Sequence, residues 1–225
     1  MPNSSSSVSD VLSKRFSVRA FKSTPVPHET LNEIFTLARQ VPSNCNVQPS
    51  QAYVVSGASK DRLKEEFTRL VTSGVPGNPD FEWMVKFEGE HRERQVDTAN
   101  ALYSAMGIER SDKERRLAVT LRNWSFFDAP HAAFFTMAKY LKLLGAVDLG
   151  IYAQTLALLM AERGISCCIQ GALNQYPAPA RKMFGLPDDV GILFGMSFGY
   201  ADESAPANQT RTNRAPLESV VRFFD

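Results

Sequence analysis

The stretch GILFGMSFGYAD, residues 191–202, decides between two fold classes for this chain. Its centre spells G-x-S-x-G, with Ser197 in the middle, which is the nucleophile-elbow motif of serine hydrolases. An elbow requires a strand before the serine, a helix after it, and an acid and then a histidine further along the chain. The run 192–194 supplies a strand, but a breaker-rich segment follows and the last histidine, His131, lies upstream. The stretch is therefore interpreted as a buried strand whose glycines admit a bulky neighbour.

Hydrophobic patterns on either side of this stretch predict the remaining elements. Strands are expected at AYVVSG (52–57), HAAFFTM (131–137), ISCCIQG (165–171) and VGILFGMSFGY (190–200). The segment RFSVRAF (15–21) alternates polar and apolar residues with the period of a strand. Helices are expected at 8–14 and at 148–164. A third is expected within 25–43, with an apolar face formed by Leu31, Ile34, Phe35 and Ala38. A fourth is expected to begin at a Ser59 cap, with an apolar face formed by Leu63, Phe67, Leu70 and Val71. The mixture indicates an α+β fold around a mixed, mostly antiparallel sheet flanked by helices.

The domain organisation follows from length and punctuation. A chain of 225 residues is expected to form one domain, here 11–225, after a serine-rich flexible leader at 1–10. Residues 73–130 begin with the breakers SGVPGNPD and carry a charged stretch, so they are interpreted as a helical excursion or lid. The helix at 148–164 is apolar nearly all round, which requires burial by its own fold or by a second subunit.

Composition limits the partners and the compartment. The formal net charge of +1 provides no field for nucleic acid or an anionic membrane, so a small-molecule partner is expected. Neither a signal peptide nor a stretch of membrane-spanning length is recognised, which favours the cytoplasm. Cys45, Cys167 and Cys168 suit reduced thiols, with Cys45 interpreted as a small buried thiol. Scattered histidines and the lack of a C-x-x-C pair argue against a metal site.

Three polar clusters remain as candidates for binding. In an extended segment Arg15, Ser17 and Arg19 project to one side, where two guanidinium groups and a hydroxyl suit a phosphate. A solvated polar face is the alternative for that segment alone. The loop VPSNCNVQPS (41–50) offers the donors and acceptors that an uncharged heteroaromatic edge requires. The tail QTRTNRAPLESVV contains Arg211 and Arg214, which an anchored anion would explain.

Five motifs together resemble the FMN-dependent nitroreductase family. They are KRFSVRAF, VPSNCNVQPS, GISCCIQGAL, GMSFGYAD and RTNRAPL, in the order and at about the spacing of that family, over almost the whole chain apart from the excursion. The resemblance implies an intertwined homodimer with two FMN sites at the subunit interface. It places GMSFGYAD in a core strand and its exit, which makes Ser197 structural. The excursion looks like that of the nitrobenzoate and nitroarene reductase subgroup.

The resemblance also assigns cofactor-binding residues. The implied set is Arg15, Phe16, Ser17, Arg19, Pro42, Ser43, Asn44, Asn46, Gln170, Gly171, Arg211 and Arg214. Arg15, Ser17 and the tail arginines match the phosphate side, whereas Arg19 lies nearer the ribityl and pyrimidine end. The 42–46 loop contacts FMN across the dimer interface in relatives, and residues 170–171 lie beside the reactive N5. Ser50 and Gln170 depart from residues common in relatives, tryptophan and glutamate respectively.

The implied activity is NAD(P)H-dependent reduction of nitroaromatic compounds, in which hydride passes through flavin N5. No side chain stands out as a general acid, and the lack of a G-x-G-x-x-G motif leaves NADH and NADPH open. Reductive dehalogenation or another FMN-dependent reduction and non-catalytic flavin binding are the alternatives. The aromatic residues of the excursion are interpreted as its own core more readily than as a roof over the flavin; they are Phe81, Trp83, Phe87, Trp124, Phe126 and Phe127.

Overall fold

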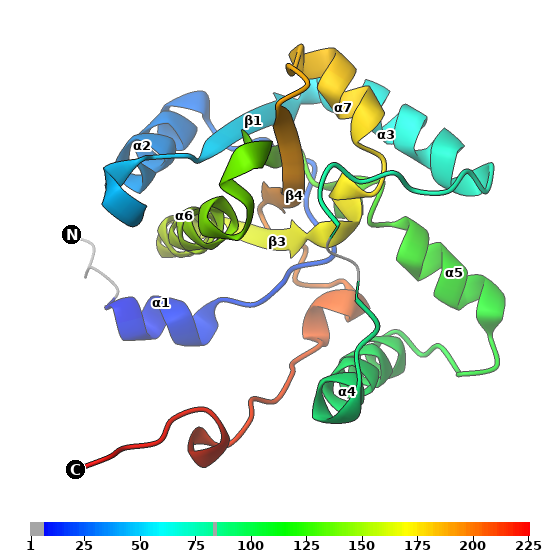
Figure 1. Ribbon diagram of the computed structural model, residues 1–225. Helices are drawn as coiled ribbons and strands as arrows, with labels where there is room; N and C mark the ends of the chain where they lie inside the picture. Colours follow the sequence, from blue (N-terminus) through cyan, green and yellow to red (C-terminus); the bar gives the residue numbers. More distant parts are fainter. Residues whose placement is uncertain (1–6, 83–84) are drawn as a thin grey trace, which may run out of the picture.

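A four-stranded antiparallel sheet forms the centre of the computed structural model, which describes residues 7–82 and 85–225 (Figure 1). The strands follow the order β1 (Gln51–Ser56), β2 (His131–Ala138), β4 (Val190–Gly199) and β3 (Ser166–Gln170). Each agrees with a strand expected from the sequence to within two residues. The two inner strands, β2 and β4, are buried almost throughout. The α+β expectation is confirmed.

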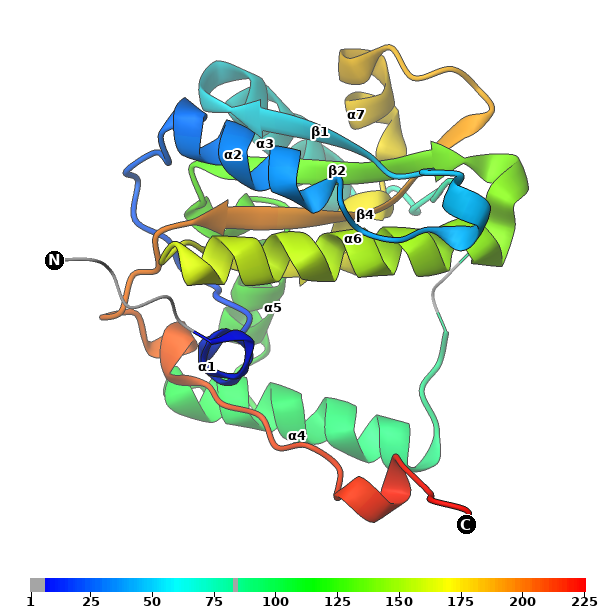
Figure 2. The same cartoon turned by 90° about the vertical axis from the view of Figure 1, so that its left-hand side faces the viewer.

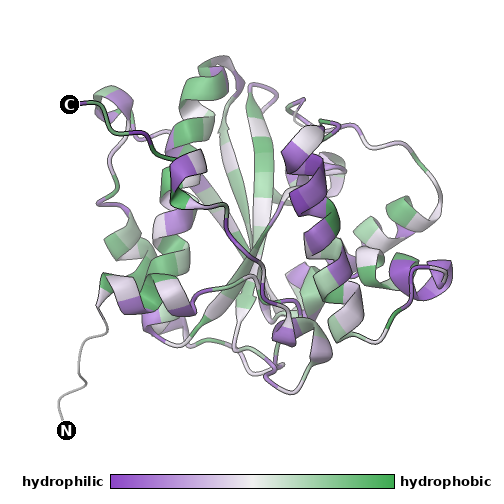
Figure 3. Cartoon of the chain, turned by 90° about the horizontal axis from the view of Figure 1, so that it is seen from below, coloured by the Kyte–Doolittle hydropathy of each residue, from purple (hydrophilic) through white to green (hydrophobic). Residues whose placement is uncertain are grey.

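Two helical layers cover the sheet, and a third group of helices stands apart from it (Figures 1 and 2). The helices of the described residues are α1 (Val8–Lys14), α2 (His28–Ala38), α3 (Gly57–Thr72), α4 (Gly89–Ala105), α5 (Lys113–Leu121), α6 (Lys142–Glu162) and α7 (Pro177–Phe184). Helices α2 and α6 pack on one face, and α3 and α7 on the other. Apolar residues run along the central strands, whereas the surrounding helices alternate apolar and polar residues (Figure 3).

The glycines of the 195–199 motif admit bulky neighbours, as the sequence indicated. A Cβ placed on Gly195 would lie 2.5 Å from the Leu173 side chain, and one on Gly199 would lie 2.6 Å from the Pro130 ring. Either contact is shorter than van der Waals packing allows, so larger residues would force the backbones apart. Ser197 between them is fully buried in β4 and does not reach solvent. Its burial removes the hydrolase interpretation.

Helix α6 is longer than the sequence pattern predicted. It starts at Lys142 rather than at 148. With the turn before it, segment 139–162 is long and apolar enough to cross a membrane by length and composition, so the expectation that no stretch reaches that length is wrong. Its inner face packs on α2, β2 and β3, and it shares one hydrophobic cluster with them. The apolar composition on that side is therefore that of a core helix.

The excursion consists of an anchored segment and two projecting helices. Asp80 accepts hydrogen bonds from Arg181 Nη1 at 3.1 Å and from the Ile192 N–H at 3.0 Å, while the Phe81 ring lies against Gly191. These contacts fix residues 73–82 to the core. Helices α4 and α5 have no buried residues, which agrees with their projection away from the sheet in Figure 2.

The buried aromatic residues of the excursion pack in the core of the sheet and its flanking helices, so the expectation that they form a core of the excursion itself is wrong. Trp124, Phe126 and Phe127 are buried in two of the hydrophobic clusters, and Phe81 packs against a third. Phe87 is 45% exposed, and Trp83 lies outside the described residues.

Three local predictions are wrong: the cap of α3, the strand at 15–21 and the burial of Cys45, whose left-handed backbone lies in an exposed loop. Helix α3 begins at Gly57, and the Ser56 hydroxyl bonds His131 Nδ1 instead of capping the helix, so Ser59 lies inside the first turn. Segment 15–21 makes only two isolated bridges, because Asn208 takes the backbone groups on which a strand would depend. Cys45 is exposed rather than buried.

Residues 8–10, which were assigned to a flexible leader from the sequence, are helical. Ser7 and Asp10 form a reciprocal capping box, in which each side chain accepts the backbone N–H of the other residue. This cap starts α1 at Val8, so residues 8–10 belong to the helix.

Candidate functional site

A cavity of about 490 Å³ brings the two arginine-bearing ends of the chain together. We call it the arginine cavity. It is lined by Leu12, Ser13, Lys14, Arg15, Phe16, Ser17, Arg19, Thr98, Thr210, Arg211, Thr212 and Arg214. The end of α1 and the extended segment after it supply one wall, the C-terminal tail supplies the other, and α4 contributes Thr98. The sequence-predicted residues 15–19, 211 and 214 are thus gathered in one place.

The charge of this cavity is strongly one-sided. Lys14, Arg15, Arg19, Arg211 and Arg214 line it, and no lining residue is acidic. Among the described residues, none of these five cations is paired with a carboxylate. The formal charge of the whole chain is only +1, so the cationic charge is concentrated here. Such a site attracts an anion.

Two polar atoms in the cavity wall have no partner within the described residues. Arg15 Nε and Thr210 Oγ1 are buried and make no hydrogen bond. A buried polar group without a partner costs about 1–3 kcal/mol, so a native structure normally satisfies it. Arg15 and Thr210 both line the cavity, and guanidinium and hydroxyl groups are donors that phosphate oxygens accept. The residues present therefore fit a phosphate-bearing ligand.

The tail arginines are fixed by contacts of their own. The Arg211 guanidinium lies 3.8 Å from the centre of the Phe16 ring, and its Nη1 donates to the carbonyls of Asn208 and Thr210. Arg214 Nη1 donates to Thr212 Oγ1 at 3.0 Å. Because these contacts immobilise the side chains, less conformational entropy is lost when an anion binds.

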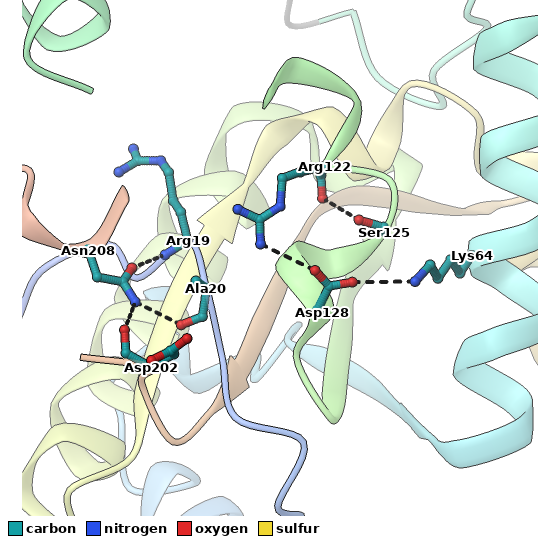
Figure 4. A network of polar contacts seen from close by, with 8 residues as sticks. All are labelled: Arg19, Ala20, Lys64, Arg122, Ser125, Asp128, Asp202 and Asn208. Atoms are coloured by element: carbon teal, nitrogen blue, oxygen red, sulfur yellow. Dashed lines mark hydrogen bonds and ion pairs between the residues drawn. The ribbon is translucent and has the colours of Figure 1, made fainter. Parts of the chain in front are cut away.

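Asn208 anchors both walls of the arginine cavity, and sequence analysis missed it. Its Oδ1 accepts the Arg19 N–H at 2.8 Å, and its Nδ2 donates to the carbonyls of Ala20 and Asp202, also at 2.8 Å (Figure 4). The bond to Arg19 joins residues 189 positions apart. A buried asparagine in a polar tail has no periodicity, so no pattern in the sequence indicated this role.

The adjacent cysteines lie behind the arginine segment. Burial, reinforced by the neighbouring Cys168, raises the pKa of Cys167 to about 12. Burial also raises the pKa of Cys168, against the lowering effects of Arg19 and of a hydrogen bond from Ser17. Both groups are therefore neutral thiols at neutral pH, which makes them poor nucleophiles and poor metal ligands.

The predicted 42–46 loop lies at the other end of α6. The Asn44 N–H donates to the Asp148 carboxylate at 3.3 Å, near the start of that helix. Ala161, near its end, lines a small cavity beside Arg15. About 20 Å of helix axis separates Asp148 from Ala161. Residues Pro42, Ser43, Asn44 and Asn46 are therefore not brought to the arginine cavity of their own chain.

Gln170 ends β3 with its side chain turned inward. The side chain is 3% exposed and bonds Ser197 and Asn123. The Gln170 side chain is therefore not free for a ligand, and its backbone is paired with Gly195 of β4. On the other face of β3, Ile169 is 45% exposed, so this part of the strand is uncovered in a single chain.

Comparison with known proteins gives a consistent result. The profile described as the Nitroreductase family matches residues 12–200. Nitroreductase NfnB of Mycolicibacterium smegmatis is 38% identical over 212 residues, which cover 93% of this chain and 89% of that protein. The 4-nitrobenzoate reductase of Pseudomonas putida is 32% identical, with 95% and 94% covered.

Solved structures agree with these relatives. The crystal structure of the FMN-dependent nitroreductase NfnB from Mycobacterium smegmatis, in complex with NADPH, has a TM-score of 0.90 at 37% identity and covers 96% of both chains. The FMN and NADPH-dependent nitroreductase NfnB from Sphigopyxis sp. strain HMH has a TM-score of 0.94 at 32% identity. It covers 98% of this chain and 100% of that one.

Proposed function

Because the chain belongs to the nitroreductase family, we propose that it is an FMN-dependent oxidoreductase that reduces nitroaromatic compounds with NADPH or NADH. Relatives that match along the whole chain are named for the reduction of 4-nitrobenzoate and nitrobenzene. The observation that carries the proposal is the arginine cavity, which has five cations and no acidic residue among the residues that line it.

The arginine cavity would hold the cofactor by its phosphate. In this proposal Arg15, Ser17, Arg211 and Arg214 bind the phosphate, and Phe16 supports Arg211 through the stacking contact described above. Arg19 lies nearer the flavin ring, where a fixed cation favours the negatively charged reduced form and raises the reduction potential. The backbone of Gln170 and Gly171 would meet the ring beside N5.

FMN, when bound, would supply hydride transfer at N5 from the nicotinamide to a second substrate in a ping-pong cycle. Reduction of a nitro group to a nitroso group consumes one NAD(P)H and one proton and releases water. A second equivalent gives the hydroxylamine. No side chain was identified as a general acid from the sequence. We therefore assign proton supply to water.

NADPH is the preferred electron donor in this proposal. The NfnB structure from Mycobacterium smegmatis contains NADPH, and the one from Sphigopyxis sp. is called NADPH-dependent. Reductive dehalogenation, the alternative considered from the sequence, is not favoured, because the relatives that match along the whole chain are named for nitro compounds. Non-catalytic flavin binding is disfavoured for the same reason.

A homodimer completes the site in this proposal. The loop at 42–46 lies too far from the arginine cavity of its own chain, so a second copy would bring it to the flavin. An exposed apolar stripe on α6, formed by Leu143, Val147 and Ile151 at helical spacing, is the surface we assign to that contact. We place the enzyme in the cytoplasm, with a small aromatic substrate and with neither nucleic acid nor membrane as a partner.

Visible spectroscopy under anaerobic conditions tests the function. The purified protein, supplied with FMN, should show a flavin band that bleaches when NADPH or NADH is added. One equivalent of a nitroarene should then restore the band. A protein that neither contains nor binds FMN would contradict the proposal, whereas bleaching without restoration by nitroarenes would leave a flavoprotein of another activity.

A further inference from the structure

We propose that Ser197, Gln170 and Asn123 form a positioning unit, the amide bridge, which fixes the 170–171 peptide and couples it to the end of the helical excursion. The inference rests on the proposed function, because it concerns the peptide assigned to the flavin. It gives the buried serine of the G-x-S-x-G motif a role other than that of a nucleophile.

The chemistry of the three residues determines the direction of every hydrogen bond. The Asn123 carbonyl oxygen, 3.0 Å from Gln170 Nε2, can only accept, so the amide nitrogen of Gln170 must face it. Asn123 Oδ1 accepts the second N–H at 3.2 Å, while Asn123 Nδ2 donates to the Thr120 carbonyl. Gln170 Oε1 then faces Ser197, whose hydroxyl donates to it. All donors and acceptors of the Gln170 side chain are thereby engaged.

The amide bridge joins the centre of the sheet to a left-handed turn. Ser197 lies in β4, and Asn123 follows α5. The Asn123 carbonyl also accepts the Phe126 N–H at 3.2 Å, where three consecutive residues, 126–128, have φ of 58°, 52° and 63°. Asp128 closes this turn through ion pairs with Lys64 at 3.4 Å and Arg122 at 3.2 Å (Figure 4). Movement of the excursion at this point would therefore pull on Gln170.

The end of β3 has few other side-chain contacts to fix it. The cross-strand partner of Gln170 is Gly195, which has no side chain, and the next residue, Gly171, already belongs to a short 3-10 turn. The pairing of Gln170 with Gly195 in the sheet holds one side of the 170–171 peptide, and the amide of Gln170 adds a side-chain contact that fixes its position. A glutamate at this position would still accept from Ser197, but its carboxylate would face the two oxygens of Asn123. The bridge therefore requires an amide.

Three variants test the bridge in the full-length protein: Ser197→Ala, Asn123→Ala and the double variant. In the FMN-free protein, Ser197→Ala should accelerate amide hydrogen exchange of residues 121–129. Residue 197 is linked to that segment only through the Gln170 side chain, so this effect would report the bridge. In the FMN-bound protein, each single variant should weaken FMN affinity at least about fivefold. Because both act through one side chain, their combined effect should be smaller than the product of the single effects.

The flavin reduction potential separates positioning from stability. A backbone N–H aimed at N5 favours the oxidised flavin, which accepts there, over the reduced flavin, which carries hydrogen there. Displacing the 170–171 peptide should therefore raise the potential in Ser197→Ala and in Asn123→Ala, neither of which adds a charge near the proposed flavin. Loss of thermal stability alone would not change the potential.

Thr136→Val is the matched control. Thr136 is fully buried in β2, next to β4, and its hydroxyl has no partner among the described residues. This variant should leave FMN affinity, potential and exchange at 121–129 unchanged. If Ser197→Ala resembles Thr136→Val in all three measurements, the amide bridge is overturned. If the wild-type protein binds no FMN, the proposed function fails, and exchange in the FMN-free variants still tests the coupling.

Discussion

Arg15 and Arg19 project from one extended segment, but their partners differ. Arg15 has a buried Nε without a hydrogen bond, whereas Arg19 Nη1 donates to the Ser17 carbonyl and its backbone is held by Asn208. We predict that Arg15→Ala weakens FMN binding by about 1.5–3 kcal/mol, the range for a hydrogen bond to a charged group, and changes the potential little. Arg19→Ala should weaken binding and also lower the potential, because a cation near the reduced ring is lost.

Equilibrium titration with FMN and a redox dye titration measure these two effects. Arg69→Ala serves as a control, since Arg69 pairs with Glu66 on the exposed side of α3. Arg214→Ala should behave like Arg15→Ala. Equal potentials in the Arg15 and Arg19 variants would contradict the division between phosphate binding and tuning of the ring.

His131 is held in its neutral form. Its Nε2 accepts the Val26 N–H at 2.9 Å, so the proton resides on Nδ1, which lies 2.5 Å from Ser56 Oγ. Burial, and then the charge of Lys60, lowers its pKa below the ordinary value of 6.5. Below about pH 6.5 the unfolded chain therefore binds a proton that the folded chain resists. The contribution of neutral His131 to the free energy of unfolding should be fully present above that pH and should decrease as the pH falls toward the lowered pKa.

Denaturant unfolding between pH 8 and pH 5 tests this expectation. The free energy of unfolding should be nearly constant above about pH 7 and fall by at most about 1.4 kcal/mol per pH unit below about pH 6.5. His131→Gln should be less stable at pH 8 but should lose most of that slope. A wild-type profile that is flat down to pH 5 would show that His131 does not limit stability.

The first residue of α6 has a backbone conformation that disfavours its side chain. Lys142 has φ 49° and ψ −132°, a combination that only glycine adopts readily, at a cost of about 1–3 kcal/mol for other residues. Its side chain is exposed and forms no ion pair among the described residues. We predict that Lys142→Gly raises the melting temperature by about 2–4 °C. Lys142→Ala retains a Cβ and should not, so a gain in both variants would assign the effect to the lost charge.

Regular elements were predictable where one periodicity dominates. Helix α2 follows from Leu31, Ile34 and Ala38, all of which are buried, and the strands follow from short apolar runs. The start of α6 was missed because Leu143, Leu144 and Val147, its first apolar residues, are exposed in a single chain and do not mark a buried face. Local patterns do not show that three consecutive residues after α5 adopt positive φ, since packing of Phe126 and Phe127 imposes it.

The charged residues of the candidate site were predictable from the sequence. The neutral and acidic residues that hold its walls in place were harder to predict. Two pairs of arginines, far apart in sequence, indicated one anion, and the structure gathers them. Asn208 and Asp80 were missed because their partners lie more than one hundred residues away. The exposure of Cys45 was missed because its left-handed backbone in the 42–46 loop has no signal in the amino-acid type.

Helix α6 organises the whole molecule, because it separates two halves of one proposed site. Its end lies beside Arg15, its beginning holds the 42–46 loop through Asp148, and its outward stripe is apolar. An antiparallel pair of α6 helices across a two-fold axis would place the loop of one copy near the arginine cavity of the other. Dimerisation and FMN binding should then be lost together.

We therefore predict that Val147→Glu converts a dimer to a monomer and abolishes retention of FMN. Val147 is 56% exposed in a single chain, where a glutamate would cost little, so an effect on assembly would identify a covered surface. Light scattering with size-exclusion chromatography gives the mass, and the flavin band gives the occupancy. Val75→Glu is the control, at a 45% exposed position in the anchored segment 73–82. This variant should remain dimeric and should retain the flavin band. A Val147→Glu protein that stays dimeric would place the interface elsewhere, and a monomer that retains FMN would show that one chain completes the site.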